Sequence, residues 1–219
     1  MTEWNTDFID RLAHDLRGPL SPLQTAAYLL KRSDMDPARQ RELVDIVDRQ
    51  SARLSTMVGE VGDWIRAQQG RLVTHREVTP LDMLLELATG PLGAQVQAAW
   101  APELADAGID GDPQRLVQMF ATLGAFALAR NPGAPLRIHV STGDAGDVLV
   151  TFDAPGEDLP PAMVDELFVT QQPAPFDDGL GLRLVIARGI AQAHGGDLQA
   201  LAPSVGGMRL IARLPLAPV

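Results

Sequence analysis

The sequence predicts an α+β protein in which an N-terminal helical hairpin precedes an α/β sandwich. Up to about residue 69, apolar residues recur in steps of three or four, the spacing of an apolar helix face. Beyond residue 70, short apolar runs of strand character are interspersed with helical segments, which is typical of helices packed on one side of a largely antiparallel sheet. We therefore predict two domains, residues 1–69 and 70–219.

The predicted hairpin consists of two long helices with a turn and a helix start at Ser33–Pro37. The apolar stripe of the first helix comprises Phe8, Leu12, Leu16, Pro19, Leu23, Ala27 and Leu30. The second helix has a seam with alternating steps of four and three, comprising Leu43, Val47, Gln50, Leu54, Met57, Val61 and Trp64. Such faces favour a homodimer in which two hairpins form a four-helix bundle. The alternative is that the hairpin packs on its own C-terminal domain.

The second domain is predicted as a series of short elements. They are a strand at 71–78, a helix at 80–88, a strand at 96–100, a helix at 112–130, strands at 136–141 and 148–153, a short helix ending near 168, a helix at 181–194 closed by two glycines, and two final strands flanking Gly206 and Gly207.

Composition excludes several classes of function. The net charge of −10 and the pI of about 4.7 argue against nucleic acid or an anionic membrane surface as the main partner. The absence of cysteine excludes disulfides, Cys-zinc sites and thiol catalysis. No apolar run is long enough to cross a bilayer, and the first residues lack the regions of a signal peptide. We expect a cytoplasmic protein, and Met1 with the strand-like ending favours a complete chain.

His14 is the first candidate for chemistry. At about 100° per residue, it projects from the helix face opposite Leu12 and Leu16, so its ring is expected in solvent. A histidine nucleophile needs an exposed neutral ring nitrogen and an adjacent base, and Asp15 is placed for that role. A solvated surface histidine is the alternative interpretation of His14 alone.

The segment His14-Asp-Leu-Arg-Gly-Pro-Leu20 resembles the phosphoacceptor box of the sensor histidine kinases. The rest of the chain follows the order of that family's ATP-binding lobe, the Bergerat fold shared with gyrase, the Hsp90 chaperones and MutL. The similar segments are Asp112–Gln118, Val148–Asp153, Gly179–Leu182, Ala193–Gly196 and Gly206–Leu210. The length and the missing sensor most resemble the histidine phosphotransferases that look like a kinase with a degenerate nucleotide lobe.

The resemblance implies roles for individual residues. His14 would accept the phosphoryl group with Asp15 as its base, and Pro19 would loosen the helix one turn later. Gly18 stands where the family has the Thr or Asn that orients water for phosphatase activity, so that activity is expected to be weak. The residues that would bind nucleotide, if binding is retained, are Asp153, Gly156, Gly179 and Gly181.

The nucleotide lobe departs from the family pattern at the metal site. Phe126 occupies the position of the asparagine that holds magnesium, and a phenyl ring cannot coordinate a cation that demands oxygen ligands. Ala129 replaces a lysine, although Arg130 is adjacent. No metal site is therefore expected.

The loops around the nucleotide depart as well. Ala154-Pro-Gly-Glu157 replaces a loop with two glycines, and it adds a carboxylate. The lid between Phe168 and Gly179 contains no Lys or Arg, while Asp177 and Asp178 would repel a triphosphate. Because phosphoryl transfer depends on positioning and charge neutralisation, these changes argue against autokinase activity.

Three functions follow as hypotheses. The first is a histidine phosphotransferase that carries a phosphoryl group between the aspartates of response-regulator receiver domains through His14, with no cofactor. The second is an active soluble histidine kinase that uses ATP and magnesium, with Asp112 or Thr122 managing the metal. The third is a non-enzymatic dimeric scaffold or kinase inhibitor.

Overall fold

A computed structural model describes residues 6–31, 35–93, 95–130, 132–143, 146–156, 160–173, 175–202 and 207–218. The predicted roles of Ser33, Glu157 and Gly206 lie outside these residues. The chain divides into two compact units, Met1–Gly62 with Asp177–Leu180, and Asp63–Phe176 with Gly181–Val219. The division therefore falls inside the second helix, and the boundary at residues 69 and 70 stays a prediction. Within the described residues, no helix is long and apolar enough to cross a membrane.

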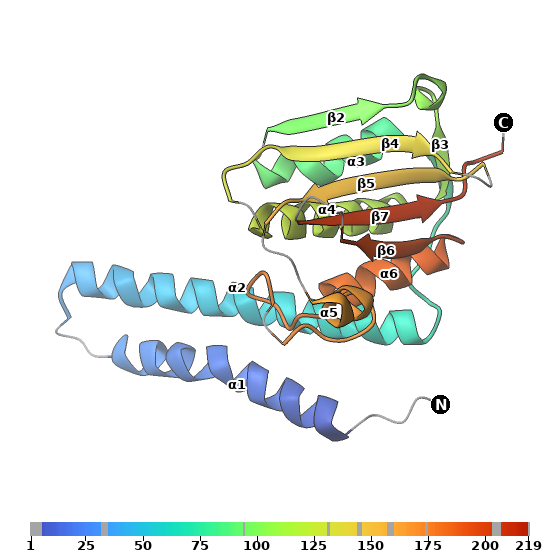
Figure 1. The fold of residues 1–219 in the computed structure, drawn as a ribbon. Helices are drawn as coiled ribbons and strands as arrows, with labels where there is room; N and C mark the ends of the chain where they lie inside the picture. The colour runs from blue at the N-terminus through green and yellow to red at the C-terminus, as the bar shows by residue number, and fades with distance from the viewer. Residues whose placement is uncertain are drawn as a thin grey trace. The chain divides into compact units, whose positions relative to one another are not determined.

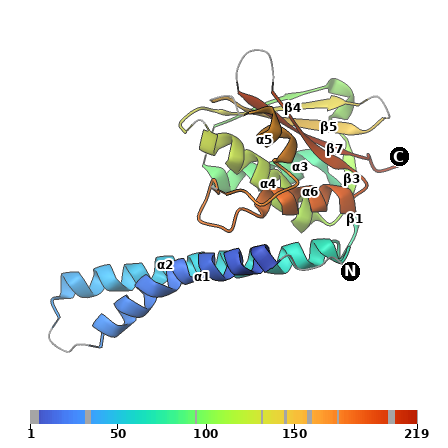
Figure 2. The same cartoon turned by 60° about the horizontal axis from the view of Figure 1, so that its bottom comes forward.

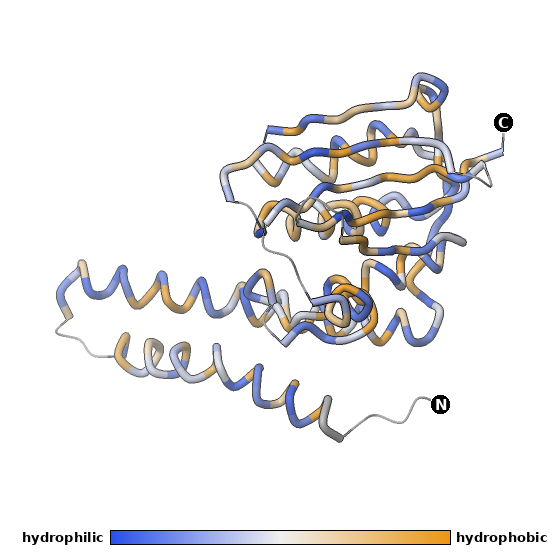
Figure 3. The backbone as a smooth tube through the Cα atoms, viewed as in Figure 1, coloured by the Kyte–Doolittle hydropathy of each residue, from blue (hydrophilic) through white to orange (hydrophobic). Residues whose placement is uncertain are grey.

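The first unit is the predicted helical hairpin (Figure 1). It consists of α1 (Thr6–Leu29) and α2 (Pro37–Gln68), whose first residue is the predicted Pro37 and whose last turn continues into the second unit. Apolar and polar bands alternate along both helices, as the stripe predicts (Figure 3). Ala26, Leu43 and Met57 are buried within the single chain. These three side chains are thus buried by the chain itself.

The second unit contains a five-stranded sheet in the order β2-β4-β5-β7-β6. Its strands are β2 (Val96–Trp100), β4 (Leu136–Thr142), β5 (Val148–Ala154), β6 (Asp197–Leu201) and β7 (Met208–Leu214). The β2–β4 pair is parallel and the other pairs are antiparallel, which confirms the predicted largely antiparallel sheet.

Three helices, α3 (Leu81–Thr89), α4 (Pro113–Arg130) and α6 (Arg183–Ala193), cover one face of this sheet (Figures 1 and 2). Side chains of β5 alternate, so that Phe152 is buried and stacks on Phe120 of α4, with ring centroids 6.2 Å apart. On the opposite, open face, Arg137 and His139 of β4 and Arg209 and Arg213 of β7 are exposed among the described residues. Short elements connect this framework: the 3₁₀ turns Gly90–Leu92 and Pro102–Leu104, and α5 (Pro161–Glu166).

A second, two-stranded sheet corrects the prediction for residues 71–78. The strand there is only β1 (Glu77–Pro80), and it pairs antiparallel with β3 (Gly108–Gly111), which the sequence analysis did not predict. β3 is four residues long and contains two glycines and an aspartate, which are poor strand formers. Its pairing is therefore a tertiary effect that residue pattern does not reveal.

Candidate functional site

His14 lies on α1 with its side chain 84% exposed, as the helix geometry predicted. Its Nδ1 is 3.3 Å from Asp15 Oδ1, and Arg11 Nε is 4.0 Å from the other oxygen of the same carboxylate. With Nδ1 protonated, the ring donates to Asp15 and keeps the lone pair of Nε2 directed away from the carboxylate. The structure thus brings the predicted nucleophile and base together in a solvent-accessible position.

The residues that follow His14 keep the helix intact. α1 continues through Pro19 and Pro22 as one helical element, and Pro19 is buried. A Cβ atom at Gly18 would meet nothing within 4 Å, so this position has room for a side chain. The kink at Pro19 and the lost phosphatase role of Gly18 stay predictions.

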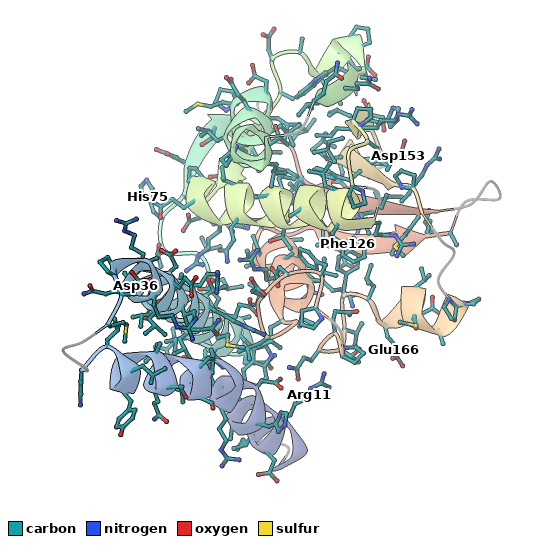
Figure 4. All side chains as sticks on the ribbon, turned by 90° about the vertical axis from the view of Figure 1, so that its left-hand side faces the viewer. Arg11, Asp36, His75, Phe126, Asp153 and Glu166 are labelled. Carbon is teal, nitrogen blue, oxygen red and sulfur yellow. The ribbon has the colours of Figure 1, made fainter. Side chains whose placement is uncertain are left out.

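Phe126 lies in the C-terminal half of α4 with only 7% of its surface exposed (Figure 4). Its ring meets Phe176 edge to face, with centroids 5.4 Å apart, and Arg130 lies 6.0 Å from its centroid. Such pairs contribute about 0.5–1.5 kcal/mol beyond the area that they bury. The ring therefore packs against another aromatic ring at the position where the family resemblance places the magnesium ligand.

Asp153 lies at the end of β5 on the open face of the sheet, since its neighbours Phe152 and Ala154 are the buried residues. Its carboxylate oxygens lie 3.3 Å from His139 Nε2 and 3.2 Å from Arg209 Nε. On the α4 side, where Phe126 lies, the strand instead presents the methyl group of Ala154. The geometry thus does not bring Asp153 together with Phe126, and its nucleotide contact stays a prediction.

Two of the predicted glycines are required by close packing. Gly156 has a φ of +149°, and a Cβ there would lie 3.0 Å from the carbonyl oxygen of Arg130. Gly181 has a φ of +77°, and a Cβ there would collide with the carbonyl oxygen of Gln172, whose amide donates to Gly181 O at 3.0 Å. These contacts explain both glycines by loop packing alone, without a nucleotide.

Gly179 belongs to the first unit, together with α2 up to Gly62. Within this unit, the amide of Leu180 donates to Glu60 Oε2 at 3.0 Å, and a Cβ at Gly179 would collide with the Glu60 carboxylate. Arg53 Nε donates to the carbonyl oxygen of Asp178 at 3.1 Å. The backbone of this glycine turn therefore binds a carboxylate of the chain itself.

Asp112 and Thr122, the residues that a kinase mechanism would use to hold magnesium, are hydrogen-bonded within the fold. The described residues contain no group of three His, Cys, Asp or Glu side chains that could hold a metal ion. Asp112 accepts from Thr74 N and Thr74 Oγ1 at 3.1 Å and from Arg115 N at 3.3 Å, while Thr122 Oγ1 donates to its own helix backbone at 2.8 Å. Both residues that a kinase mechanism would recruit thus hold the fold together.

Sequence reasoning missed a carboxylate of the second unit, Asp63, that joins α2 to α4. Asp63, in the last turns of α2, accepts from Arg66 at 2.6 Å, from Arg115 at 2.9 Å and from Gln118 at 2.7 Å. Burial raises the pKa of Asp63, but these hydrogen bonds and the charge of Arg115 outweigh it, so the pKa lies below its usual value. Nothing in the spacing of α2 and α4 indicates this long-range cluster.

His194 is the C-cap residue of α6 and also joins distant segments. Its Nδ1 donates to Ile190 O at 2.7 Å and its Nε2 accepts from Asp112 N at 2.9 Å, so the buried ring is neutral. Burial lowers the pKa of His194. A Cβ at Gly111 would collide with the ring, which explains the small residue there.

Two families match the chain. Residues 4–70 match the His Kinase A (phospho-acceptor) domain, and residues 111–218 match the histidine kinase-, DNA gyrase B- and HSP90-like ATPase domain. The first match contains His14 and the second contains Phe126, so the two candidate regions fall in the two domains that the resemblance indicated.

Similar proteins include the sensor protein KdpD of Rathayibacter rathayi, which is 33% identical over 97% of this chain and 25% of its own length. The sensor protein VanSC of Enterococcus gallinarum is 28% identical over 89% of this chain and 56% of its own length. The chain thus spans a quarter to just over half of these relatives.

Solved structures show the same fold. The histidine kinase AdeS of Acinetobacter baumannii superposes with a TM-score of 0.68 at 16% identity, covering 94% of this chain and 98% of that one. The histidine kinase ThkA, solved in complex with the response regulator protein TrrA, gives a TM-score of 0.73 at 20% identity and covers 97% of this chain and 62% of that one. The chain belongs to the histidine kinase family, with the helical hairpin of its phosphoacceptor domain followed by a Bergerat-type ATPase lobe.

Proposed function

We propose that this chain is a histidine phosphotransferase of two-component signalling. His14 accepts a phosphoryl group from the aspartyl phosphate of one receiver domain and passes it to the aspartate of another. The observation that carries the proposal is the contrast in side chains: the nucleophile is exposed and adjacent to a half-buried carboxylate, while an apolar pair, Phe126 and Phe176, lies where the ATP chemistry would need oxygen ligands.

The geometry at His14 supports a balanced transfer. The Nε2 lone pair attacks phosphorus, the N–P bond forms, and the bond from phosphorus to the receiver carboxylate oxygen breaks. The ring then carries a positive charge with its proton still on Nδ1, and Asp15, 3.3 Å away, stabilises that charge. The reverse reaction with a second receiver restores the neutral ring. No step requires a group that this chain lacks.

The hairpin supports a homodimer as the working form. Several residues of the stripe and the seam are only half-buried in one chain, among them Leu12, Leu16, Leu23, Val47, Leu54 and Val61. Each half-buried leucine or valine gains about 1 kcal/mol or more when a second hairpin covers it. We infer that two hairpins associate as a four-helix bundle.

An active ATP-dependent kinase is the second candidate. The match of residues 111–218 to an ATPase domain favours it, because that domain implies ATP binding, usually with magnesium. The donor set argues against it, since Phe126, Asp112 and Thr122 are all engaged in packing or hydrogen bonds of the fold. A non-enzymatic scaffold, the third hypothesis, needs no chemistry at His14.

The test uses a purified receiver domain that carries labelled phosphate on its aspartate. Mixed with the wild-type chain, it is expected to transfer acid-labile label to His14, and His14→Ala abolishes this transfer. His75→Ala is the matched control, because His75 is another exposed histidine, with a side chain 71% exposed. Transfer that survives in His14→Ala, or that never occurs in the wild type, would reject the proposal in favour of the scaffold.

A further inference from the structure

β2 is an edge strand whose outer side has no neighbouring strand in the described part of the chain. Val96, Gln97, Ala98 and Ala99 are exposed, and Trp100 is half-buried. Proteins commonly protect exposed edges with charged side chains, proline or bulges. From Gln95 to Pro102 the sequence contains no charged residue, and the strand itself contains no proline. This edge is therefore available for pairing.

The opposite edge of the same sheet is protected. β6 begins with Asp197, whose carboxylate pairs with Arg188 at 2.8 Å, and this hydrogen bond holds the pKa of Asp197 below its usual value. An additional strand at β6 would meet that charged pair. β6 thus begins with a charged pair, whereas β2 contains no charged residue.

The ladder between β2 and β4 fixes which backbone groups point outward. Gln95 O accepts from Leu136 N at 2.8 Å, and Ala101 N donates to Val140 O at 2.9 Å. Alternate residues of a parallel strand bond to the same neighbour, so Gln97 and Ala99 also face β4. Val96, Ala98 and Trp100 consequently direct their N–H and C=O groups to the outer side of β2, which is the edge of the sheet in Figure 1.

We propose that β2 pairs antiparallel with β2 of a second copy, centred on Ala98, so that the two sheets become continuous. This register is self-complementary: Val96 bonds with Trp100 of the second copy, and the two Ala98 residues bond with each other. The side chains of these three residues share the helix side of the sheet with their register partners Leu136, Ile138 and Val140.

The symmetry of this register and the lack of charged residues on β2 favour a second copy of the chain as the partner. At the centre, two small alanine side chains face each other, while each Trp100 lies across the Val96 of the second copy, a favourable aromatic pair with a β-branched residue. Two chains of net charge −10 repel each other, and an uncharged edge is where that repulsion is least. A second copy therefore brings no charged side chain to this edge.

The contact is small, so it is expected to be weak and concentration-dependent. It is independent of the proposed phosphotransfer and of the hairpin dimer, since it lies entirely on β2. A chain with two isologous faces, one on the hairpin and one on β2, assembles into closed tetramers or open strings of dimers. If the hairpin does not dimerise, β2 pairing gives dimers instead.

The experiment measures sedimentation and amide hydrogen exchange of the full chain from about 10 µM to about 1 mM. Ala98→Lys places like charges opposite each other at the symmetry axis. Ala98→Pro removes the outward N–H group and leaves the hydrogen bonds to β4 intact. Ala99→Lys is the matched control, because it adds the same charge one residue along, on the open face of the sheet.

In the wild type and in Ala99→Lys, the mass is expected to double with concentration, and exchange at Val96, Ala98 and Trp100 slows by about tenfold or more. Both effects disappear in Ala98→Lys and in Ala98→Pro. Phosphotransfer through His14 is unchanged in all variants, so failure here leaves the proposed function standing. A constant mass in the wild type, or association that survives both substitutions at Ala98, overturns the proposal.

Discussion

The phosphoacceptor helix and the ATPase lobe differ in what they offer to a phosphoryl group. On α1, His14 and Asp15 lie 3.3 Å apart, and the side chain of His14 is exposed to solvent. In the lobe, the residues at the candidate metal positions are engaged in the fold: Phe126 is buried against Phe176, and Asp112 accepts hydrogen bonds from Thr74 and Arg115. An exposed histidine beside a carboxylate is accessible to a phosphoryl group. A side chain that is packed or hydrogen-bonded within the domain instead stabilises the fold.

The largest expected effect is on the rate of phosphoryl transfer to His14, when Asp15 is replaced. Asp15→Ala removes the carboxylate that orients His14 and stabilises its charge, and removal of one such electrostatic group costs about 10²–10³-fold in rate. The transfer rate from a phosphorylated receiver, followed by rapid quenching, checks this loss. Asp10→Ala is the control, since Asp10 is an exposed carboxylate on the same helix. Equal rates in the two variants would remove Asp15 from the mechanism.

In the lobe, Phe126→Asn restores the residue type of a magnesium ligand but leaves a cavity and a buried amide. We expect a loss of about 3–5 kcal/mol in the free energy of unfolding, as for other buried aromatic truncations, and no labelling from ATP. Urea unfolding and an ATP incubation measure the two outcomes. Ala129→Asn, on the exposed side of α4, should cost well under about 1 kcal/mol. A Phe126→Asn variant that is stable and takes label from ATP would contradict a purely structural Phe126.

The free energy of unfolding of the second unit is expected to fall in two stages as the pH is lowered. Burial lowers the pKa of His194, so its stabilising contribution is complete above the ordinary histidine value of about 6.5 and declines as the pH falls below it. The pKa values of Asp63, Asp112 and Asp197 are also lowered, and their contributions decline below a pH of about 4. Unfolding free energies measured from pH 8 to pH 3 test both stages. In His194→Gln the first decline should vanish, whereas His75→Ala should retain it.

The smallest effect is expected at Gly18, the position of the missing phosphatase residue. Gly18→Thr adds a hydroxyl group where a Cβ meets nothing within 4 Å, and it raises helix stability by a few tenths of a kcal/mol, about the difference between the two helix propensities. We expect a few-fold faster loss of phosphate from a receiver, measured as release of inorganic phosphate. Gly18→Ala separates the hydroxyl from the added helix stability. Equal release in both variants would mean that the hydroxyl does not orient water.

The sequence pattern predicted the long helices and the position of His14 beside Asp15, because each of these features depends on residues that are close together in the sequence. The apolar stripe predicted α1 and α2, the pair Asp112–Pro113 predicted the start of α4, and adjacency predicted the contact of His14 with Asp15. Long-range pairing was not predictable in this way. β3 forms only because β1 lies beside it, and Phe126 finds Phe176 across fifty residues of sequence.

Asp153 shows the same limit within a correctly predicted strand. The sequence placed Asp153 at the end of β5, but the open face on which it meets His139 and Arg209 is set by the helices that cover Phe152. A one-residue difference along a strand moves a side chain to the other face of the sheet. The motif alone therefore does not establish that this carboxylate reads a nucleotide.

The central claim is that phosphate reaches His14 from a receiver and not from ATP. The most direct measurement incubates the chain in parallel with γ-labelled ATP and magnesium and with a labelled receiver, and maps acid-labile label by mass spectrometry. The account predicts label on His14 from the receiver alone. Label on His14 from ATP, absent in His14→Ala, would contradict it and would identify the lobe as a working ATPase domain.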